Sequence, residues 1–181
     1  MQAEIITIGD ELLIGQVVDT NSAWLGRTLG EDGIKVTQIT SVQDDADQIA
    51  RAVNEALARV SIVLVTGGLG PTRDDITKHT LAELFGMRLV RDEQVYETVR
   101  RQLAVRGIAF NELNRGQALV PDGCTVLPNR NGTAPGMWFE RGRKILVSMP
   151  GVPFEMKALV TDEVLPRLRT HFSLHATVHR T

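Results

Sequence analysis

Residues 62–68 read Ile62-Val63-Leu64-Val65-Thr66-Gly67-Gly68, an apolar run that stops at a pair of glycines. A short, fully apolar run of this kind is typical of a central parallel strand, because helices cover both of its faces. Glycine after such a strand lets the chain turn sharply. The stretch therefore predicts an α/β protein with this strand near the middle of a parallel sheet.

Short apolar runs alternate with helical patterns on either side of this strand. The predicted strands are 5–8, 34–40, 62–65, 125–127, 137–139 and 145–147. The predicted helices start at Thr20-Asn21-Ser22, at Asp44-Asp45, near Asp75, before Val95, near Asn114 and at Pro153. Alternation of strand and helix indicates right-handed βαβ units and a mostly parallel sheet with helices on both sides. The last three strands lie close together in sequence, so we expect one antiparallel edge.

Length and composition limit the function classes. The chain has 181 residues, about one domain, and its 20 Lys+Arg against 22 Asp+Glu leave a net charge of −2 with no basic patch. No apolar run approaches the roughly 20 residues that span a bilayer, and the first residues carry no basic signal region. The lone Cys124 excludes an internal disulfide and has no neighbouring His, so no catalytic thiol is expected. We expect a cytoplasmic protein that binds neither nucleic acid nor membrane.

Three loops follow predicted strands, where open α/β sheets bind their ligands. They are residues 9–15, 66–75 and 148–153. In the second, Gly67, Gly68 and Gly70 allow bare backbone to approach a ligand, and the following helix favours an anion such as phosphate. It is not a Walker A loop, because no Gly-Lys-Ser/Thr follows, and it is not a dinucleotide fingerprint, because Arg73 stands where the third glycine belongs. A tight turn with Thr72 and Asp75 as a capping box is an equally good interpretation.

Carboxylates occur beside each of these loops. Asp74 and Asp75 would repel an anion unless a cation bridged them, so they suggest Mg²⁺ or a similar hard ion. Asp10 and Glu11 follow the first strand in the same topological position, and Asp44 and Asp45 follow the second. Each pair could instead cap a helix, and Glu155 could simply complement the dipole of the helix that Pro153 opens.

The last stretch differs from the rest. Residues 171–181 alternate apolar and polar side chains, which is typical of a strand, and the element has no continuation. We therefore expect a domain at 1–170, with 171–181 the start of a linker in a longer protein. In isolation the stretch should pack poorly or pair with another chain.

Five motifs in order resemble the N-terminal domain of the CinA (competence/damage-inducible) family. They are Ile8-Gly9-Asp10-Glu11-Leu12-Leu13-Ile14-Gly15, Asp19-Thr20-Asn21-Ser22, residues 67–77, Pro128-Asn129 with Gly132-Thr133-Ala134-Pro135-Gly136, and residues 149–156. That domain is similar to the molybdopterin-binding MogA and MoaB proteins, so the resemblance implies a three-layer αβα sandwich. In full-length relatives a nicotinamide-mononucleotide deamidase domain follows, and no such activity is expected of this chain.

The resemblance also implies an activity. The family is associated with metal-dependent hydrolysis of the pyrophosphate bond of ADP-ribose, which would give AMP and ribose 5-phosphate with Mg, Mn or Co. The alternatives are an enzyme that binds or adenylylates molybdopterin, and a non-catalytic nucleotide-sensing domain. Each implies a phosphate-containing nucleotide or pterin ligand. We also expect a homo-oligomer.

Roles are carried over from the family motifs and the loops together. Asp75 and Asp44 are the expected catalytic residues, and Asp10, Asp74 and Asp75 the expected metal ligands. A basic residue is common in the family segment that is here Asn114-Arg115-Gly116-Gln117-Ala118, so Arg115 is expected to supply that charge. The expected ligand-binding residues are Gly9, Asn21, Gly67, Gly68, Gly70, Thr72, Asn114, Arg115, Gly151 and Glu155.

Overall fold

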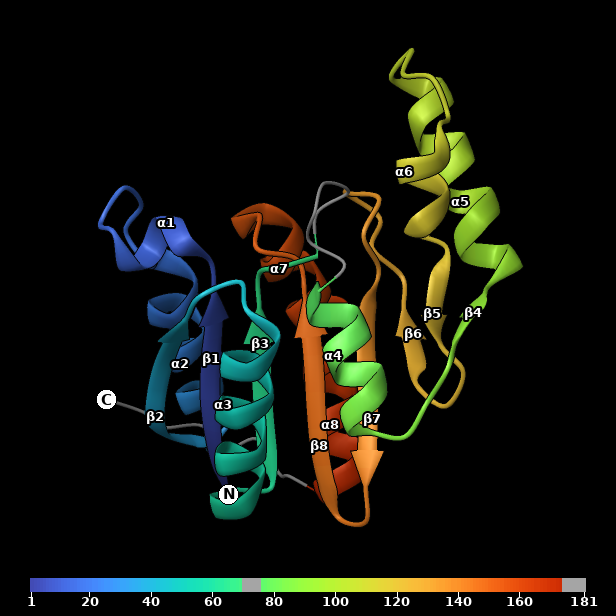
Figure 1. The fold of residues 1–181 in the computed structure, drawn as a ribbon. Helices are drawn as coiled ribbons and strands as arrows, with labels where there is room; N and C mark the ends of the chain where they lie inside the picture. The colour runs from blue at the N-terminus through green and yellow to red at the C-terminus, as the bar shows by residue number, and fades with distance from the viewer. Residues whose placement is uncertain (70–75, 174–181) are drawn as a thin grey trace.

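A computed structural model describes residues 1–69 and 76–173, apart from the side chain of Leu113, and has a six-stranded sheet between two layers of helices (Figure 1). In spatial order the strands are β2 (Lys35–Val42), β1 (Gln2–Ile8), β3 (Ile62–Thr66), β8 (Lys144–Met149), β7 (Gly136–Arg141) and β6 (Thr125–Leu127). The pairs β2–β1, β1–β3 and β3–β8 are parallel, whereas β8–β7 and β7–β6 are antiparallel. The predicted α/β class, with its mostly parallel sheet and antiparallel edge, is confirmed.

The helices divide between the two faces of the sheet. One face carries α2 (Thr20–Glu31), α7 (Pro153–Leu159), the π-helical turn η1 (Val160–Val164) and α8 (Leu165–Phe172). The other carries α3 (Ala46–Arg59) and α4 (Ile76–Leu84). Alternate residues of β1 explain the two cores, because Ile5 packs in the first and Ile6 in the second. β3 is buried along its whole length, as its apolar run predicts.

The chain reverses its direction of winding at β1. It passes from β1 outward to β2 and then returns to β3 on the other side of β1. Such a switch point leaves a crevice beyond the carboxyl ends of the two strands, because the connecting helices lie on opposite faces. Ile8 ends β1 and Thr66 ends β3, so Gly9 and Gly67 begin the loops at this crevice.

A lobe beside the antiparallel edge was not predicted. β4 (Leu89–Arg91) and β5 (Leu119–Pro121) form a separate two-stranded sheet, from which α5 (Glu93–Val105) and α6 (Glu112–Gly116) project. Its core is small and comprises Val95, Val99, Leu103, Ala118 and Val120. Both strands are three residues long, and β4 ends in the charged Arg91 and β5 in Pro121, so neither stands out as a strand in the sequence. We call β4, β5, α5 and α6 the side lobe.

Two helix starts differ from the prediction. The N-cap of α2 is Asp19, whose carboxylate accepts the Ser22 N–H at 2.9 Å, rather than an oxygen of Thr20, Asn21 or Ser22. The predicted loop at Asp10 forms the short helix α1 (Asp10–Leu13) instead. Asp45 caps α3 through the Gln48 N–H, and Pro153 is the first residue of α7, as expected.

The C-terminal helix contains a one-turn widening, η1, directly before Pro166. Proline lacks an N–H and its ring crowds the carbonyl four residues earlier, which the wider turn accommodates. The expected strand from His171 is wrong for its first residues, because α8 continues through Phe172 and ends at Ser173. The predicted boundary at 170 therefore falls inside a helix, and residues 174–181 lie outside the described part.

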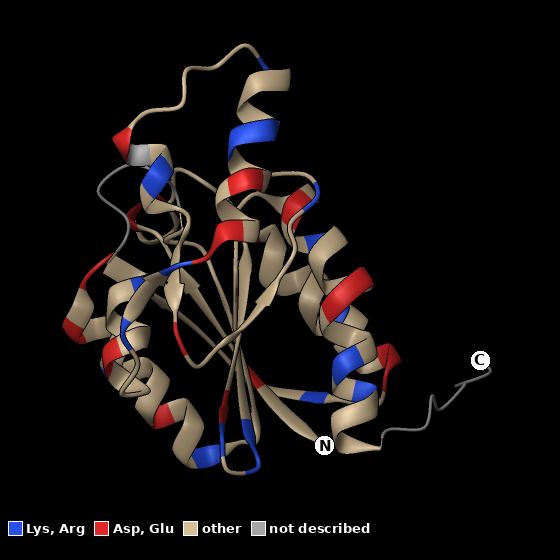
Figure 2. Cartoon of the chain, turned by 90° about the vertical axis from the view of Figure 1, so that its right-hand side faces the viewer, with Lys and Arg blue, Asp and Glu red and all other residues tan. Residues whose placement is uncertain are grey.

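Along the ribbon in Figure 2, the positions of Lys and Arg alternate with those of Asp and Glu in the described part of the chain. Two basic residues of the β7–β8 hairpin contact helix ends. Arg141 donates to the Leu84 carbonyl at the end of α4, and Lys144 donates to the Leu57 carbonyl near the end of α3.

In the described ranges, no helix has the length and apolar character needed to cross a membrane.

Candidate functional site

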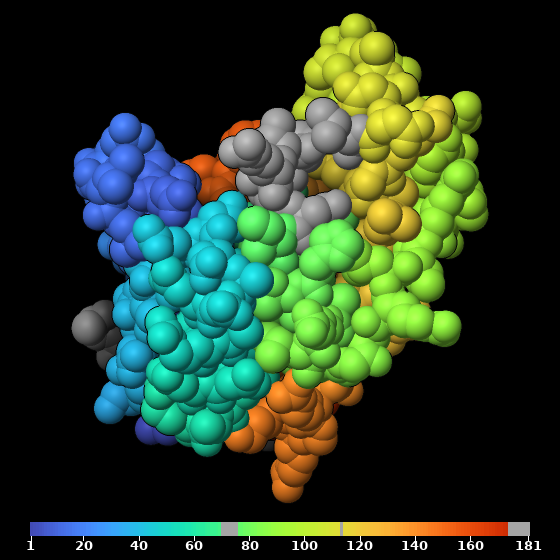
Figure 3. Space-filling model, in the orientation of Figure 1, coloured from blue at the N-terminus to red at the C-terminus, as the bar shows by residue number. Residues whose placement is uncertain are grey.

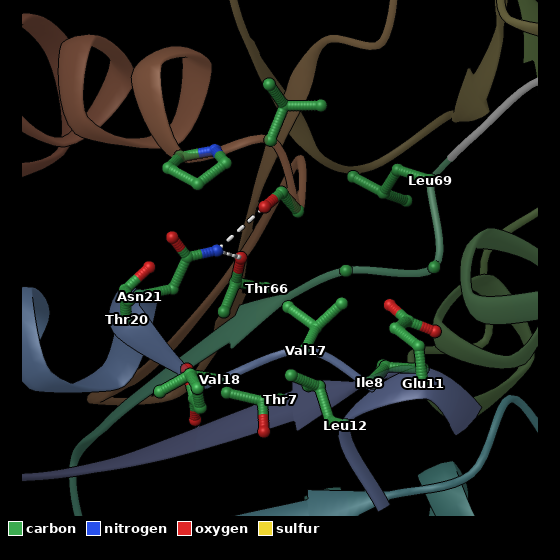
Figure 4. Close-up of a pocket in the computed structure, with 16 residues that line it drawn as sticks. Thr7, Ile8, Glu11, Leu12, Val17, Val18, Thr20, Asn21, Thr66 and Leu69 are labelled. Carbon is green, nitrogen blue, oxygen red and sulfur yellow. Dashed lines mark hydrogen bonds between the residues drawn. The ribbon is translucent and has the colours of Figure 1, made fainter. Parts of the chain in front are cut away.

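A cavity of about 370 Å³ lies at the switch point, where β1 and β3 end. The segment from α1 to α2 bounds one side, and the loop from β8 to α7 bounds another (Figure 4). Its lining comprises Thr7, Ile8, Glu11, Leu12, Val17, Val18, Asp19, Thr20, Asn21, Thr66, Gly67, Gly68, Leu69, Gly151, Val152 and Pro153. We call this cavity the cleft. In the space-filling view the α1 segment and the side lobe project on opposite sides of the same upper edge (Figure 3).

Backbone forms the part of the cleft beyond β3. Gly67 and Gly68 have positive φ values of 104° and 65°, which other residues rarely adopt. A Cβ on Gly67 would overlap the Ile8 carbonyl oxygen, and one on Gly68 would overlap the Thr77 hydroxyl. No described hydrogen bond uses the N–H of Gly68 or Leu69. The predicted glycines therefore lie where bare backbone can face a ligand.

Asn21 connects α2 to the loop between β8 and α7. Its Nδ2 donates to the Gly151 carbonyl at 2.8 Å and to Thr66 Oγ1 at 3.4 Å, as Figure 4 shows, and that hydroxyl donates to the Pro150 carbonyl at 3.0 Å. Gly151 in turn lies close to the loop that follows β3, because a Cβ atom on Gly151 would lie 3.2 Å from Gly67 Cα. Asn21 and Gly151 thus both border the cleft, and together they fix one of its walls.

Asn21→Asp is expected to lower the free energy of unfolding by about 2 kcal/mol at pH 7, because a carboxylate would face the Gly151 carbonyl with no proton to donate. Thermal melting should fall by about 4–8 °C for a chain of this size. Gln38→Glu is the matched control, since the Gln38 amide donates to Thr40 Oγ1 at an exposed position. Equal melting temperatures for the two variants would contradict the structural role of Asn21.

The charged side chains among the described residues of the cleft are negative. Glu11 and Asp19 line it, and no Lys, Arg or His does so among the described residues. Both oxygens of Asp19 are engaged, one with the Ser22 N–H and one with the Ser22 hydroxyl at 2.6 Å. Glu11 lies on the opposite side of the cleft from Asn21 (Figure 4). An anionic ligand would therefore need a cation from elsewhere.

Asp10 and Asp44 do not line the cleft. Asp10 is the exposed first residue of α1, and its Oδ1 accepts the Asp44 N–H at 3.4 Å. That contact links α1 to the turn before α3. The first loop instead presents Glu11, while Gly9 only precedes the helix. Of the two carboxylates in the motif, the structure thus brings the second one to the cleft.

Three further predicted residues also lie outside the lining. Glu155 accepts a hydrogen bond at 2.7 Å from Nδ2 of the buried Asn129, so it anchors α7 to the loop at 128–135. Asn114 donates to the Ala109 carbonyl, and Arg115 pairs with Glu112 at 2.6 Å within α6. These contacts belong to the side lobe and its neighbouring loop, so the structure does not bring these three residues to the cleft.

Four predicted residues, Gly70, Thr72, Asp74 and Asp75, lie outside the described residues. Within the described ones, no three His, Cys, Asp or Glu side chains are grouped so that they could hold a metal ion. The described residues alone therefore do not supply the expected metal site. Two described carboxylates line the cleft, those of Glu11 and Asp19, and that of Asp19 already accepts two hydrogen bonds from Ser22.

Some cleft residues were not among those predicted to bind ligand. Glu11 is a candidate carboxylate beside the first loop, together with Asp10, but only Asp10 is among the expected metal ligands. Val17, Val18 and Val152 carry no chemical signal, and only their place beside the glycine loop could have suggested a role. The Thr66 hydroxyl follows an apolar run and looks like the end of a strand.

Cys124 packs between the core on the α3–α4 face and that of the side lobe, and burial raises its pKa to about 12. Since the folded state holds the proton, stability should fall as the pH rises above about 8.5, where the unfolded thiol ionises. At pH 8, alkylation by iodoacetamide should be at least about 100-fold slower in the native protein than in urea. Comparable rates would contradict the burial of this thiol.

Comparison with known proteins adds the family. The model of the family described as "Probable molybdopterin binding domain" matches residues 4–170. The crystal structure of the CinA protein of Thermoplasma acidophilum has a TM-score of 0.83 at 34% identity, over 94% of this chain and 97% of that one. The chain belongs to this family and is CinA-like. A CinA-like protein of Cytophaga hutchinsonii is 48% identical over 98% of the chain, which spans 43% of that relative.

A further solved structure shares this fold. A molybdenum cofactor biosynthesis protein B has a TM-score of 0.64 at 25% identity, over 98% of this chain and 97% of that one. A CinA-like protein of Gemmatimonas aurantiaca is 47% identical over 93% of the chain and 40% of its own length. The expected three-layer sandwich of the molybdopterin-binding type is thereby confirmed.

Proposed function

We propose that this CinA-like domain binds a phosphate-bearing nucleotide in the cleft and hydrolyses its pyrophosphate bond. ADP-ribose is the proposed substrate, and AMP and ribose 5-phosphate are the products. The observation that carries the proposal is the cavity of about 370 Å³ at the switch point, beside the bare backbone of Gly67 and Gly68. Its size lies in the usual range for small-molecule sites, and its place is the usual one in open α/β sheets.

The backbone is the proposed phosphate contact. The N–H groups of Gly68 and Leu69 have no acceptor among the described hydrogen bonds, and a phosphate oxygen is a strong acceptor. The glycines let the phosphate approach without a side chain in between. The bond from Asn21 to Gly151 holds the adjoining wall in place, so the group to be cleaved would be held in one orientation.

The negative lining supports a requirement for a cation. A pyrophosphate beside Glu11 is repelled unless a divalent ion reduces the charge. Mg²⁺, Mn²⁺ or Co²⁺ would also favour ionisation of a bound water, and the proposed protein ligands are Asp74 and Asp75 with Glu11 in place of Asp10. Asp75 is proposed to orient the attacking water. Asp44 is not retained in that role, because it is not among the residues that line the cleft.

The test is release of AMP from ADP-ribose, followed by chromatography, with each of the three metals and with EDTA. FAD, NAD and ATP serve as competing substrates that also contain pyrophosphate. The proposal predicts metal-dependent release of AMP and ribose 5-phosphate in equal amounts. If all four compounds remain intact with every metal, the hydrolase assignment is wrong and a binding role takes its place.

A second candidate function is the binding or adenylylation of molybdopterin. It is favoured by the family match and by the fold of the molybdenum cofactor biosynthesis protein. Molybdopterin also joins a nitrogen heterocycle to a phosphate, so the same backbone could receive it. Incubation with molybdopterin and ATP distinguishes the two candidates, because adenylylation releases pyrophosphate without consuming ADP-ribose.

A further inference from the structure

Exposed aliphatic side chains gather at the mouth of the cleft. Val17, Val18 and Val152 line it, and they are 51%, 80% and 42% exposed. Single exposed valines are common on protein surfaces, but three around one cavity leave apolar area in water at a place where a ligand enters. Their position, rather than their number, is what needs an explanation.

These valines come from two separate segments. Val17 and Val18 precede α2, whereas Val152 directly precedes α7 and its neighbour Pro153 also lines the cleft. In Figure 4 the Val17 side chain points into the space between Asn21 and Leu69. The bond from Asn21 to the Gly151 carbonyl fixes the second segment relative to the first. The two segments therefore hold an aliphatic rim, defined here as Val17, Val18, Val152 and Pro153.

A phosphate gains nothing from such a rim, because it would lose water there without finding a donor. The faces of a purine or pterin ring are apolar, and its polar atoms lie at the edge, so methyl groups can cover the faces without leaving a donor unpaired. The cleft thus has two chemically different parts, bare backbone at Gly67 and Gly68 and aliphatic side chains at the rim. A nucleotide has the same two parts.

We propose that the aliphatic rim is the base subsite of the cleft and holds the purine ring of the nucleotide. This inference rests on the proposed function, which makes the ligand a nucleotide. It goes further by naming the residues that contact the base. Ring binding at the rim would direct the phosphates toward Gly67 and Gly68. It would contribute to affinity and specificity, and it would leave the chemical step unchanged.

The experiment compares two double variants by calorimetric titration with AMP and with ribose 5-phosphate, each with and without Mg²⁺. Val18→Asn/Val152→Asn changes the rim, and Val90→Asn/Val105→Asn changes two valines outside the cleft that are 40% and 84% exposed. The rim variant should raise the Kd for AMP at least about tenfold and change that for ribose 5-phosphate less than twofold. The control variant should change neither.

Three results would overturn the base subsite. They are no AMP binding to the natural protein, an equal loss for both compounds in the rim variant, and an equal loss of AMP affinity in the control variant. If 6-hydroxymethylpterin binds with the same dependence on the rim while AMP does not bind, the ring held there is a pterin and the purine assignment is wrong.

Failure of the subsite can be told apart from failure of the proposed function. If AMP binds with the expected dependence on the rim but ADP-ribose is not cleaved, the hydrolase assignment fails and the subsite stands. If ADP-ribose is cleaved and the rim variant keeps the natural KM, the hydrolase stands and the subsite fails. A true base subsite should raise KM with little change in kcat.

Discussion

Gly67→Ala is expected to lower the free energy of unfolding by at least about 3 kcal/mol and the melting temperature by roughly 10 °C. Two penalties combine at this position. The φ of 104° is unfavourable for alanine, and the new Cβ would overlap the Ile8 carbonyl oxygen, which belongs to the backbone of the neighbouring strand. Neither β1 nor the loop can move away cheaply, because β1 lies between β2 and β3.

Gly107→Ala is the matched control for this prediction. Gly107 also has a positive φ, of 67°, but nothing lies within 4 Å of the position of its Cβ. Its replacement should cost only about 1 kcal/mol. Chemical denaturation of both variants measures the difference, and similar losses would mean that the close approach to Ile8 is not a constraint.

Asp75→Asn is expected to reduce metal-dependent AMP release from ADP-ribose by at least about 100-fold, with a nearly unchanged melting temperature. Asp75 directly precedes α4 in the sequence, and Asn can cap a helix about as well as Asp. The substitution therefore removes the negative charge that a metal or water requires and keeps the capping oxygen. Turnover and melting should be measured on the same preparation.

Asp45→Asn provides the comparison for Asp75→Asn. Asp45 caps α3 through the Gln48 N–H at 3.0 Å, and it does not line the cleft. Its replacement should leave both turnover and melting nearly unchanged. Full turnover in a folded Asp75→Asn variant would reduce Asp75 to a capping residue, and Glu11 would then be the carboxylate to replace next.

The large sheet could be predicted from sequence because its signals are local. The apolar run at 62–65, the helical spacing of Ile49, Val53, Ala56 and Leu57, and the proline at 153 each match the observed element. The helices α5 and α6 of the side lobe were predicted, whereas its strands β4 and β5 and the turn η1 were not. β4 and β5 gain their stability from pairing with each other across about thirty residues of chain, and no local pattern reports such a pairing.

The site was predictable in its backbone and less so in its side chains. Gly67, Gly68, Asn21 and Gly151 border one cavity because strands β1, β3 and β8 end at one edge of the sheet. Whether Asp10 or Glu11 faces the cavity depends on where α1 begins, since neighbouring residues of a helix point about 100° apart. A one-residue shift in the start of α1 changes which carboxylate faces the cavity. It leaves the hydrophobic pattern of the sequence unchanged, so the pattern cannot report it.

The side lobe has a core of its own, joined to the rest through Cys124 and Val126. Local opening free energies rise with buried apolar area, so a lobe with so few buried side chains should open as a separate cooperative unit, below the energy of global unfolding. In native-state hydrogen exchange, the amides of α5 should exchange in step with those of β5 and well before those of β3. We therefore expect the side lobe to unfold and refold locally while the six-stranded sheet stays folded.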